Sequence, residues 1–225
     1  MAELTLTTFL TLDGVMQAPG GPREDQSGNF PHGGWLVPHA DDDIGRIMVE
    51  ILSKADACLL GRTTYDIFAA YWPRVTGAED TIATKLNSLP KYIASRTQTM
   101  FSWSGTALVR DVTKEVVTLK SRFPHEVQVH GSCGLAQTLI ENDLIDEYRL
   151  LIFPIILGTG AVPTSLTLVK SNTTSKGVVV SVYRRGGSLR TGSFALDLDV
   201  NFTQHYDKTE LFKKPRRPLS ALLGA

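Results

Sequence analysis

The sequence predicts an α/β fold in three layers: a mixed, mostly parallel central sheet flanked by helices, with an antiparallel hairpin near the C-terminus. Short apolar runs typical of buried strands alternate with helical patterns over most of the chain. Two of these runs break at a glycine that opens a helix, at Gly61 and at Gly131. Further on, two runs rich in β-branched and aromatic residues flank the segment 184–187, which ends in two glycines and signals a hairpin turn.

The N-terminal elements follow from periodicity and from helix breakers. Residues 3–12 alternate apolar and polar side chains, as a half-buried strand does. The segment 17–39 holds so many glycines and prolines that we expect a long loop, and such loops are usually functional or disordered. Apolar residues three and four apart then predict a helix over 44–52, with the acidic residues 41–43 at its N-terminus.

The remaining elements alternate between strand and helix as far as residue 157. The run 148–157 predicts a fully buried strand because it is rich in Ile and Leu. The other elements are short, and their bounds come from the glycines, prolines and acidic residues between them. We expect strands at 57–60, 92–95 and 127–130, helices at 64–71, 114–122 and 134–142, and the two hairpin strands at 178–183 and 193–198.

Composition restricts the possible partners. The 225 residues carry 23 basic and 23 acidic side chains, so no overall charge attracts nucleic acid or an anionic membrane. The longest apolar run is too short to span a bilayer and no leader pattern is present, so we expect a cytoplasmic protein whose partner is a small molecule. We expect one domain over 1–198 and a polar, basic extension over 199–225.

The cysteines and histidines predict no metal site. Cys58 and Cys133 are too few for a disulfide framework or a zinc site, and we expect both to be buried free thiols. His32 and His39 border the long loop, where they are candidates for the wall of a substrate pocket. Their spacing fits no metal ligand pattern, so surface or core positions suit them better than ligation.

The two glycine turns predict a dinucleotide site. A strand that ends in glycine and opens a helix leaves free backbone N–H groups at the positive end of the helix dipole, and no Cβ keeps a phosphate away. In the first turn, Arg62 and Thr63 follow Gly61 and suit an extra phosphate such as the 2′-phosphate of NADPH. The alternative for Arg62 is a surface ion pair with Asp66, one turn along the helix.

These residues occur in the same order in a known family. The sequence resembles the dihydrofolate-reductase-like superfamily, and within it the branch that contains the C-terminal reductase domain of the bifunctional deaminase-reductase of riboflavin biosynthesis. The resemblance covers residues 3–198 and is carried by a set of short segments. These are Asp13–Gly14, Leu60–Tyr65, Asn87–Tyr92 with Ser95–Arg96, Gly131–Ser132, and Leu144–Tyr148 through to Gly158.

The resemblance implies an NADPH-dependent hydride transfer and, frequently, a homodimer. It assigns cofactor binding to three groups of residues: Gly61, Arg62 and Thr63; Ser95 and Arg96; and Gly131, Ser132 and Leu135. Many members have two adjacent glycines at the second turn, whereas this chain has serine at 132. The zinc deaminase signature that accompanies some riboflavin reductases is absent from this sequence.

A reductase of this kind also needs a proton source and a substrate pocket. The candidates for the proton source are Asp43, Asp42, Asp13 and Tyr65, of which Asp43 or Asp42 falls nearest to the carboxylate of dihydrofolate reductases. The alternatives are a helix-capping role for residues 41–43 and a turn role for Asp13. We expect the substrate to contact Val15, Tyr65 and Phe153.

Two functions follow as expectations. The first is an NADPH-dependent reductase acting on a small heterocyclic substrate, pterin or ribosylaminopyrimidine-like, or on a carbonyl compound. The riboflavin-branch resemblance makes a 5-amino-6-(5-phosphoribosylamino)uracil reductase-like or dihydrofolate reductase-like activity the specific form of this hypothesis. The second is a dimer that binds a nucleotide or another ligand without turnover, since a fold does not fix a function.

Overall fold

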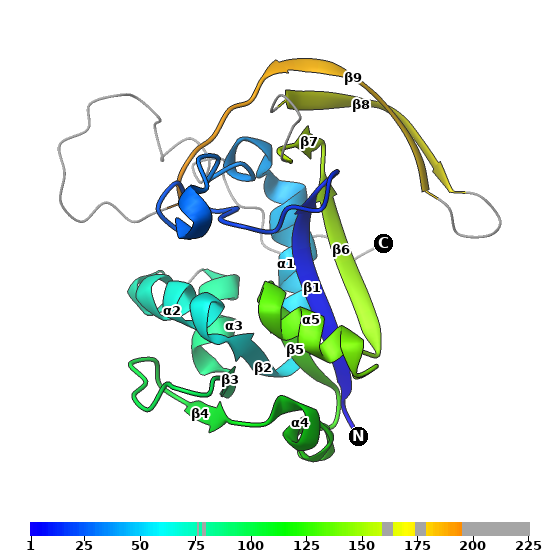
Figure 1. The fold of residues 1–225 in the computed structure, drawn as a ribbon. Coiled ribbons are helices and arrows are strands. Elements are labelled where there is room, and N and C mark those ends of the chain that lie inside the picture. The colour runs from blue at the N-terminus through cyan, green and yellow to red at the C-terminus, as the bar shows by residue number, and fades with distance from the viewer. Residues whose placement is uncertain (76, 78–79, 159–163, 174–178, 195–225) are drawn as a thin grey trace, which may run out of the picture. The chain divides into compact units, whose positions relative to one another are not determined.

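The computed structural model describes residues 1–75, 77, 80–158, 164–173 and 179–194 (Figure 1). By their contacts the residues divide into two units, Met1–Ala195 and Leu196–Ala225. The first unit holds every described residue. The predicted extension over 199–225 lies outside the described residues.

A six-stranded parallel sheet forms the centre of the first unit. Its strand order is β4-β3-β2-β5-β1-β6, and every neighbouring pair runs parallel. The strands are β1 (Glu3–Thr11), β2 (Ala55–Gly61), β3 (Lys91–Ala94), β4 (Thr106–Val109), β5 (Glu126–His130) and β6 (Glu147–Phe153). The helices are α1 (Asp42–Ser53), α2 (Arg62–Tyr71), α3 (Thr81–Ser88), α4 (Val112–Ser121) and α5 (Cys133–Glu141).

Three further strands form a small antiparallel sheet in the order β7-β8-β9. They are β7 (Ile155–Ile156), β8 (Thr164–Thr173) and β9 (Val179–Ser188). The long β8–β9 hairpin curves away from β7 in Figure 1. The Leu166 N–H donates to the Pro154 carbonyl at 2.8 Å, which ties the start of β8 to the segment between β6 and β7.

The two faces of the parallel sheet bury different side chains because residues alternate along each strand. On β5, Val127 and Val129 face α4 and α5 and join a wholly apolar cluster with Leu4 and Leu6 of β1. The alternate residues of β5 face α1, where the Gln128 side chain donates to the Ile51 carbonyl at 2.7 Å. Figure 1 shows α5 in front of β5 and α1 behind β1, in agreement with this alternation.

The predicted fold class is confirmed, and most elements begin and end within two or three residues of their expected positions. The hairpin turn was expected too far along the chain: β9 continues through 184–187 with a shift in register, and its partner is β8. Of the expected second strand, 193–198, residues 195–198 lie outside the described residues. The polar and β-branched sequence of β8 alternates weakly and gave no strand signal. The short helix α3 and the strand β4 were also missed.

Two burial predictions are wrong. The run 148–157 is not fully buried, because β6 is the edge strand and its outward side chains Tyr148, Leu150 and Ile152 are about half exposed. Cys58 is buried as predicted, but Cys133 is exposed because it begins α5 at the surface. In the described part of the chain, no helix combines the length and the apolar character needed to cross a membrane.

Candidate functional site

Three neighbouring strands of the sheet end at the predicted cofactor-binding residues. Gly61 is the last residue of β2 and pairs in register with Ala94, the last residue of β3. Gly131 directly follows β5, the neighbour of β2 on the other side. Because carboxyl ends of parallel strands meet at one edge of a sheet, the three predicted groups of cofactor residues lie along that edge.

The side chain of Ser132 joins the two glycine turns. Its Oγ accepts a hydrogen bond from the Gly61 N–H at 3.0 Å and donates one to the His130 carbonyl at 3.1 Å. A Cβ on Gly61 would lie 3.3 Å from the Ser132 Cβ, which is tighter than most such contacts, and 3.6 Å from the Leu135 Cβ, which is an ordinary contact. Glycine at position 61 therefore allows the two turns to approach each other.

The second turn uses two consecutive residues in the left-handed region. Gly131 has φ +54° and Ser132 has φ +61°. The left-handed conformation costs a residue with a Cβ about 1–2 kcal/mol, so Ser132 stays there only because its surroundings hold it. The Gly131 N–H donates to the Thr7 carbonyl at 2.9 Å, which fixes this turn against β1.

The helices that follow the two turns begin without a side-chain cap. Neither α2 nor α5 has a capping hydrogen bond or an acidic residue in its first turn. In contrast, Asp41, Asp80 and Asp111 each accept an N–H from the first turn of α1, α3 and α4. The free N–H groups and positive dipole ends of α2 and α5 therefore remain available for an anion.

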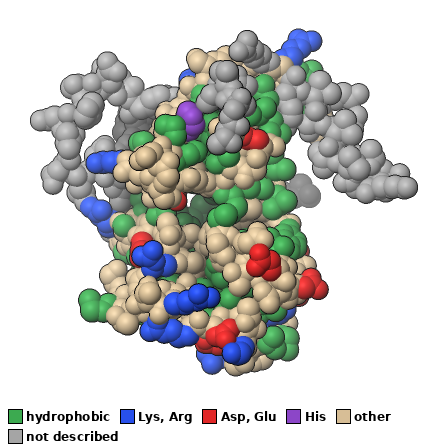
Figure 2. Space-filling view, viewed as in Figure 1, with side chains coloured by type: hydrophobic (Ala, Val, Ile, Leu, Met, Phe, Trp, Pro, Cys, Tyr) green, Lys and Arg blue, Asp and Glu red, His purple; other side chains and the backbone are tan. Residues whose placement is uncertain are grey.

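Basic side chains lie beside these helix ends. Arg62 and Arg96 are exposed, and within the described residues neither guanidinium forms an ion pair; Asp66, the alternative partner of Arg62, instead accepts from Gln98 at 3.4 Å. The Ser95 Oγ accepts the Gln98 N–H at 3.1 Å. Figure 2 shows basic side chains over the region of α2, β3 and β4. The arrangement suits a ligand with several phosphates.

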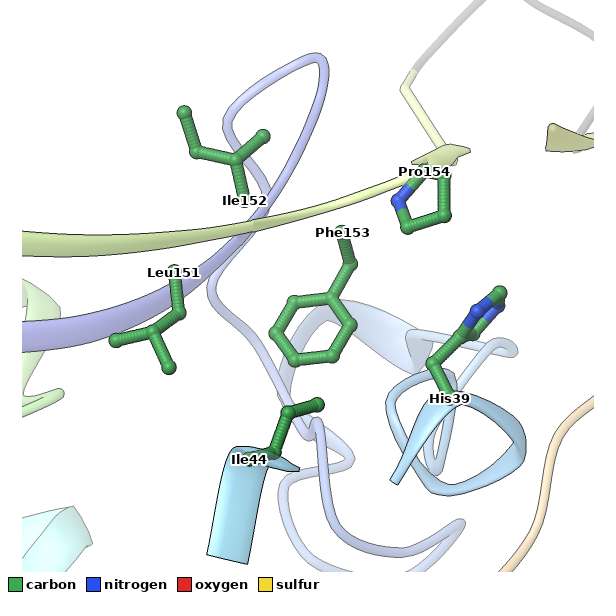
Figure 3. Close-up of a pocket in the computed structure, with 6 residues that line it drawn as sticks. All are labelled: His39, Ile44, Leu151, Ile152, Phe153 and Pro154. Atoms are coloured by element: carbon green, nitrogen blue, oxygen red, sulfur yellow. The ribbon is translucent and has the colours of Figure 1, made fainter. Parts of the chain in front are cut away.

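A pocket of about 260 Å³ lies where β6 passes the start of α1 (Figure 3). Phe153 forms its centre, with its ring 6.3 Å from the His39 ring in an edge-on contact. Burial, followed by the positive charge of Arg190, lowers the pKa of His39, so its imidazole is neutral near neutral pH. The pocket is lined by His39, Ile44, Leu151, Ile152, Phe153 and Pro154.

The three carboxylates among the candidate proton donors lie in different surroundings. The Asp13 carboxylate accepts hydrogen bonds from Thr11 Oγ1 at 2.6 Å, from the Leu157 N–H at 3.1 Å and from the Gly158 N–H. Partial burial opposes ionisation of Asp13, but these hydrogen bonds hold its pKa below the usual range. Asp42 is exposed, and Asp43 is exposed and paired with Arg46. None of the three carboxylates lines the pocket.

The predicted substrate contacts are not brought together. Phe153 lines the pocket, and Val15 is half-buried against the same apolar cluster. Tyr65 belongs to a different cluster, where it is 2% exposed and its hydroxyl accepts the Trp103 N–H at 3.1 Å. His39 also lines the pocket, which was one of the two alternatives that its position at the end of the long loop left open.

A second group of residues was missed entirely. Glu126, Gln128 and His130 alternate with valines along β5 and are all buried on the face towards α1. Polar residues at every second position of a buried strand were the signal for this row. Hydrogen bonds connect these side chains from Glu126 to His130, which directly precedes the second glycine turn.

Comparisons with known proteins identify the family of this chain and two similar proteins. The model of the RibD C-terminal domain family matches residues 2–181. The uncharacterized protein YyaP of Bacillus subtilis (strain 168) is 28% identical over 194 residues, covering 82% of this chain and 96% of that protein. A crystal structure of a pyrimidine reductase-like protein from Corynebacterium diphtheriae covers 82% of this chain and 92% of its own, with a TM-score of 0.45 and 13% sequence identity.

The family match spans the parallel sheet, both glycine turns and the start of β9. It confirms the resemblance to the reductase branch that the ordered motifs had indicated. The chain belongs to the RibD C-terminal domain family.

Proposed function

We propose that the protein is an NADPH-dependent reductase that transfers a hydride to a small heterocyclic substrate, pterin or ribosylaminopyrimidine-like, or to a carbonyl compound. One observation carries the proposal: two uncapped helix N-termini, α2 and α5, are joined through the Ser132 hydroxyl at the carboxyl edge of a parallel sheet. Such an edge is where α/β proteins bind nucleotides, and the paired helix ends suit a pyrophosphate.

Each part of the turn region has a binding task in this proposal. The free N–H groups of the first turns of α2 and α5 hold the pyrophosphate. Arg62 and Thr63 bind the 2′-phosphate, since both are exposed directly after Gly61. Ser95 and Arg96, at the end of the neighbouring strand β3, contact the adenosine. When bound, NADPH supplies the hydride, and the protein supplies position and the exclusion of water.

A proton must reach the substrate by another route. His39 is neutral near neutral pH and lines the pocket, so it can orient a water molecule there. Asp42 and Asp43 remain proposed donors because they directly precede Ile44, which also lines the pocket. We further propose that the protein is cytoplasmic and forms a homodimer. Light scattering of the purified protein tests the homodimer.

The alternative is a dimer that binds its ligand without turnover. The observation in its favour is that hydrogen bonds from Thr11, Leu157 and Gly158 occupy the Asp13 carboxylate, while Asp43 is paired with Arg46. A protein that binds NADPH but oxidises none of it with any pterin, pyrimidine or carbonyl compound would support this second function. Oxidation of NADPH, followed at 340 nm, would support the first.

Replacing Arg62 by alanine tests the cofactor. We expect the variant to bind NADPH about 10–100-fold more weakly, because a charge-assisted contact with the 2′-phosphate is lost, while NADH binding changes little. Tryptophan fluorescence quenching gives both dissociation constants. Arg122→Ala is the matched control, since Arg122 is exposed and follows α4, before β5 begins. Equal losses for both cofactors, or wild-type protein that binds neither, would contradict the proposed function.

A further inference from the structure

A row of buried polar side chains crosses the α1 face of the sheet beside the second glycine turn. Glu126, Gln128 and His130 of β5 are 7%, 0% and 6% exposed. Thr5 and Thr7 of β1 lie opposite Gln128 and His130 in register and are buried on the same face. A buried polar group costs free energy unless it is hydrogen-bonded. A polar atom of this row that has no partner in the protein is therefore a candidate for a hydrogen bond to a ligand.

Hydrogen bonds connect the side chains of the row in sequence, from Arg149 through Glu126 and Gln128 to His130. The guanidinium of Arg149 donates two bonds of 2.8 Å to the two carboxylate oxygens of Glu126. The Gln128 Nε2 donates to Glu126 Oε2 and to the Ile51 carbonyl, each at 2.7 Å. Both amide hydrogens are therefore used, which fixes the orientation of the Gln128 amide and turns its Oε1 towards His130.

This orientation decides the tautomer of His130. The distance between His130 Nε2 and Gln128 Oε1 is 3.1 Å, and an amide oxygen only accepts, so Nε2 carries the proton. The Nδ1 atom is consequently a bare acceptor. Burial, followed by the positive charge of Arg149, lowers the pKa of His130 to about 4, while Glu126 acts weakly in the opposite direction. Near neutral pH the ring is therefore uncharged.

His130 Nδ1 has no partner within the described residues. The fully enclosed side-chain atoms that lack a hydrogen bond there are Thr5 Oγ1 and Thr7 Oγ1. His130 is 6% exposed and is the last residue of β5, so its unpartnered Nδ1 lies at the carboxyl edge of the sheet, where the second glycine turn begins. Thr7 places a second unpaired polar atom beside it in register. The row thus ends, at the carboxyl end of β5, in a buried acceptor without a partner among the described residues.

The position of this acceptor relates it to the proposed dinucleotide. His130 directly precedes Gly131, whose N–H donates to the Thr7 carbonyl. One row further along the same face, the register places Phe9 of β1 beside Leu151 of β6, and both belong to the apolar cluster that lines the pocket. A ligand that enters here meets apolar walls and one acceptor, an environment that fits a flat ring bearing an amide N–H.

We propose that His130 Nδ1 accepts a hydrogen bond from an amide-type N–H of the ligand at the reacting end of the site. Arg149, Glu126 and Gln128 act as positioning residues that fix the tautomer. The inference rests on the proposed function. The N–H belongs either to the carboxamide of the nicotinamide or to a ring amide of the heterocyclic substrate, and binding experiments separate these two sources.

The first arm compares NADP⁺ with its 3-acetylpyridine analogue, which keeps the carbonyl but replaces the amide nitrogen by a methyl group. If the carboxamide is the donor, the wild type binds NADP⁺ about 10-fold more tightly, because the analogue leaves His130 Nδ1 without a partner. His130→Phe keeps a ring but has no acceptor, so it loses this preference. His130→Asn carries an oxygen near the place of Nδ1 and retains it to within about 3-fold, whereas His130→Gln does not.

The second arm is a titration of the NADPH-bound protein with 5,6-diaminouracil and with its N1,N3-dimethyl derivative. If the substrate is the donor, the wild type prefers the unmethylated ring by about 10-fold, and His130→Phe abolishes the preference. Nitrogen-15 NMR of the imidazole reports the tautomer directly, and Gln128→Leu is expected to release it. Circular dichroism shows which variants are folded.

The outcomes separate this inference from the function on which it rests. Wild-type protein that binds no dinucleotide overturns both. Binding without discrimination in either ligand pair, discrimination that survives in His130→Phe, or a proton on Nδ1 in the wild type overturns the inference and leaves the proposed function in place.

Discussion

Gly134→Asp is expected to weaken NADPH binding strongly and to stabilise the protein. Position 134 lies in the first turn of α5, and a Cβ there meets no atom within 4 Å. The added carboxylate would compete with a phosphate for the free N–H groups of α5. Two like charges 4 Å apart near a protein surface repel by about 4 kcal/mol, so affinity should fall at least about 100-fold.

The stability of this variant should change in the opposite direction. Removing a helical glycine and placing an acid at a helix N-terminus together raise the free energy of unfolding by about 1 kcal/mol. The melting temperature should therefore rise by about 2–4 °C. Gly134→Asn is the matched control, because it has the same shape without the charge and should retain much more of the affinity. Unchanged NADPH binding in Gly134→Asp would show that no phosphate lies at α5.

Arg149→Met is expected to be the most destabilising of the substitutions considered. The side chains of Arg149 and Glu126 are only 14% and 9% exposed, and their two hydrogen bonds join β6 to β5 across β1. Removing one partner of a buried ion pair leaves the other charge uncompensated and costs about 3–5 kcal/mol. The melting temperature should fall by about 10 °C, measured by circular dichroism.

A double variant separates the charge from the packing. Adding Glu126→Gln to Arg149→Met removes the orphaned charge and keeps an acceptor for Gln128, so at least half of the lost stability should return. Burial opposes ionisation of Glu126, but Arg149 and Gln128 hold its pKa below the ordinary glutamate range. This contribution to stability is therefore present above the unfolded pKa and is lost as the pH falls through the folded one. The double variant should lack it.

The parts of the fold that the sequence predicted are those with a strong local signal. The helix α1 has apolar residues at helical spacing and an aspartate cap, Asp41, that the structure confirms. The strands β2 and β5 are short, and each stops at a glycine that opens a helix. The hairpin turn was misplaced because the sequence of β8 gave no strand signal, and the glycines 186 and 187, which lie within β9, were interpreted as the turn.

In the site, too, features with a local sequence signal were predictable, and features that depend on contacts between distant residues were not. The glycine turns were predictable because each is a local event, a strand that ends and a helix that begins. The link through Ser132 was not, because it joins residues 71 positions apart. The tautomer of His130 depends on a chain of contacts through Gln128, Glu126 and Arg149, which only the register of β5 and β6 on either side of β1 brings together.

The hydroxyl of Ser132 has a consequence for protein engineering. The Ser132 hydroxyl accepts a hydrogen bond from the Gly61 N–H of β2 and donates one to the His130 carbonyl of β5, so the conformations of the two glycine turns depend on each other. If only the first glycine turn were replaced by that of another reductase, in order to change the cofactor preference, the new turn would not match Ser132. Chimeras that carry both glycine turns of the other reductase should fold and bind its dinucleotide. Chimeras that carry only one of the two turns should lose affinity for NADPH and NADH alike.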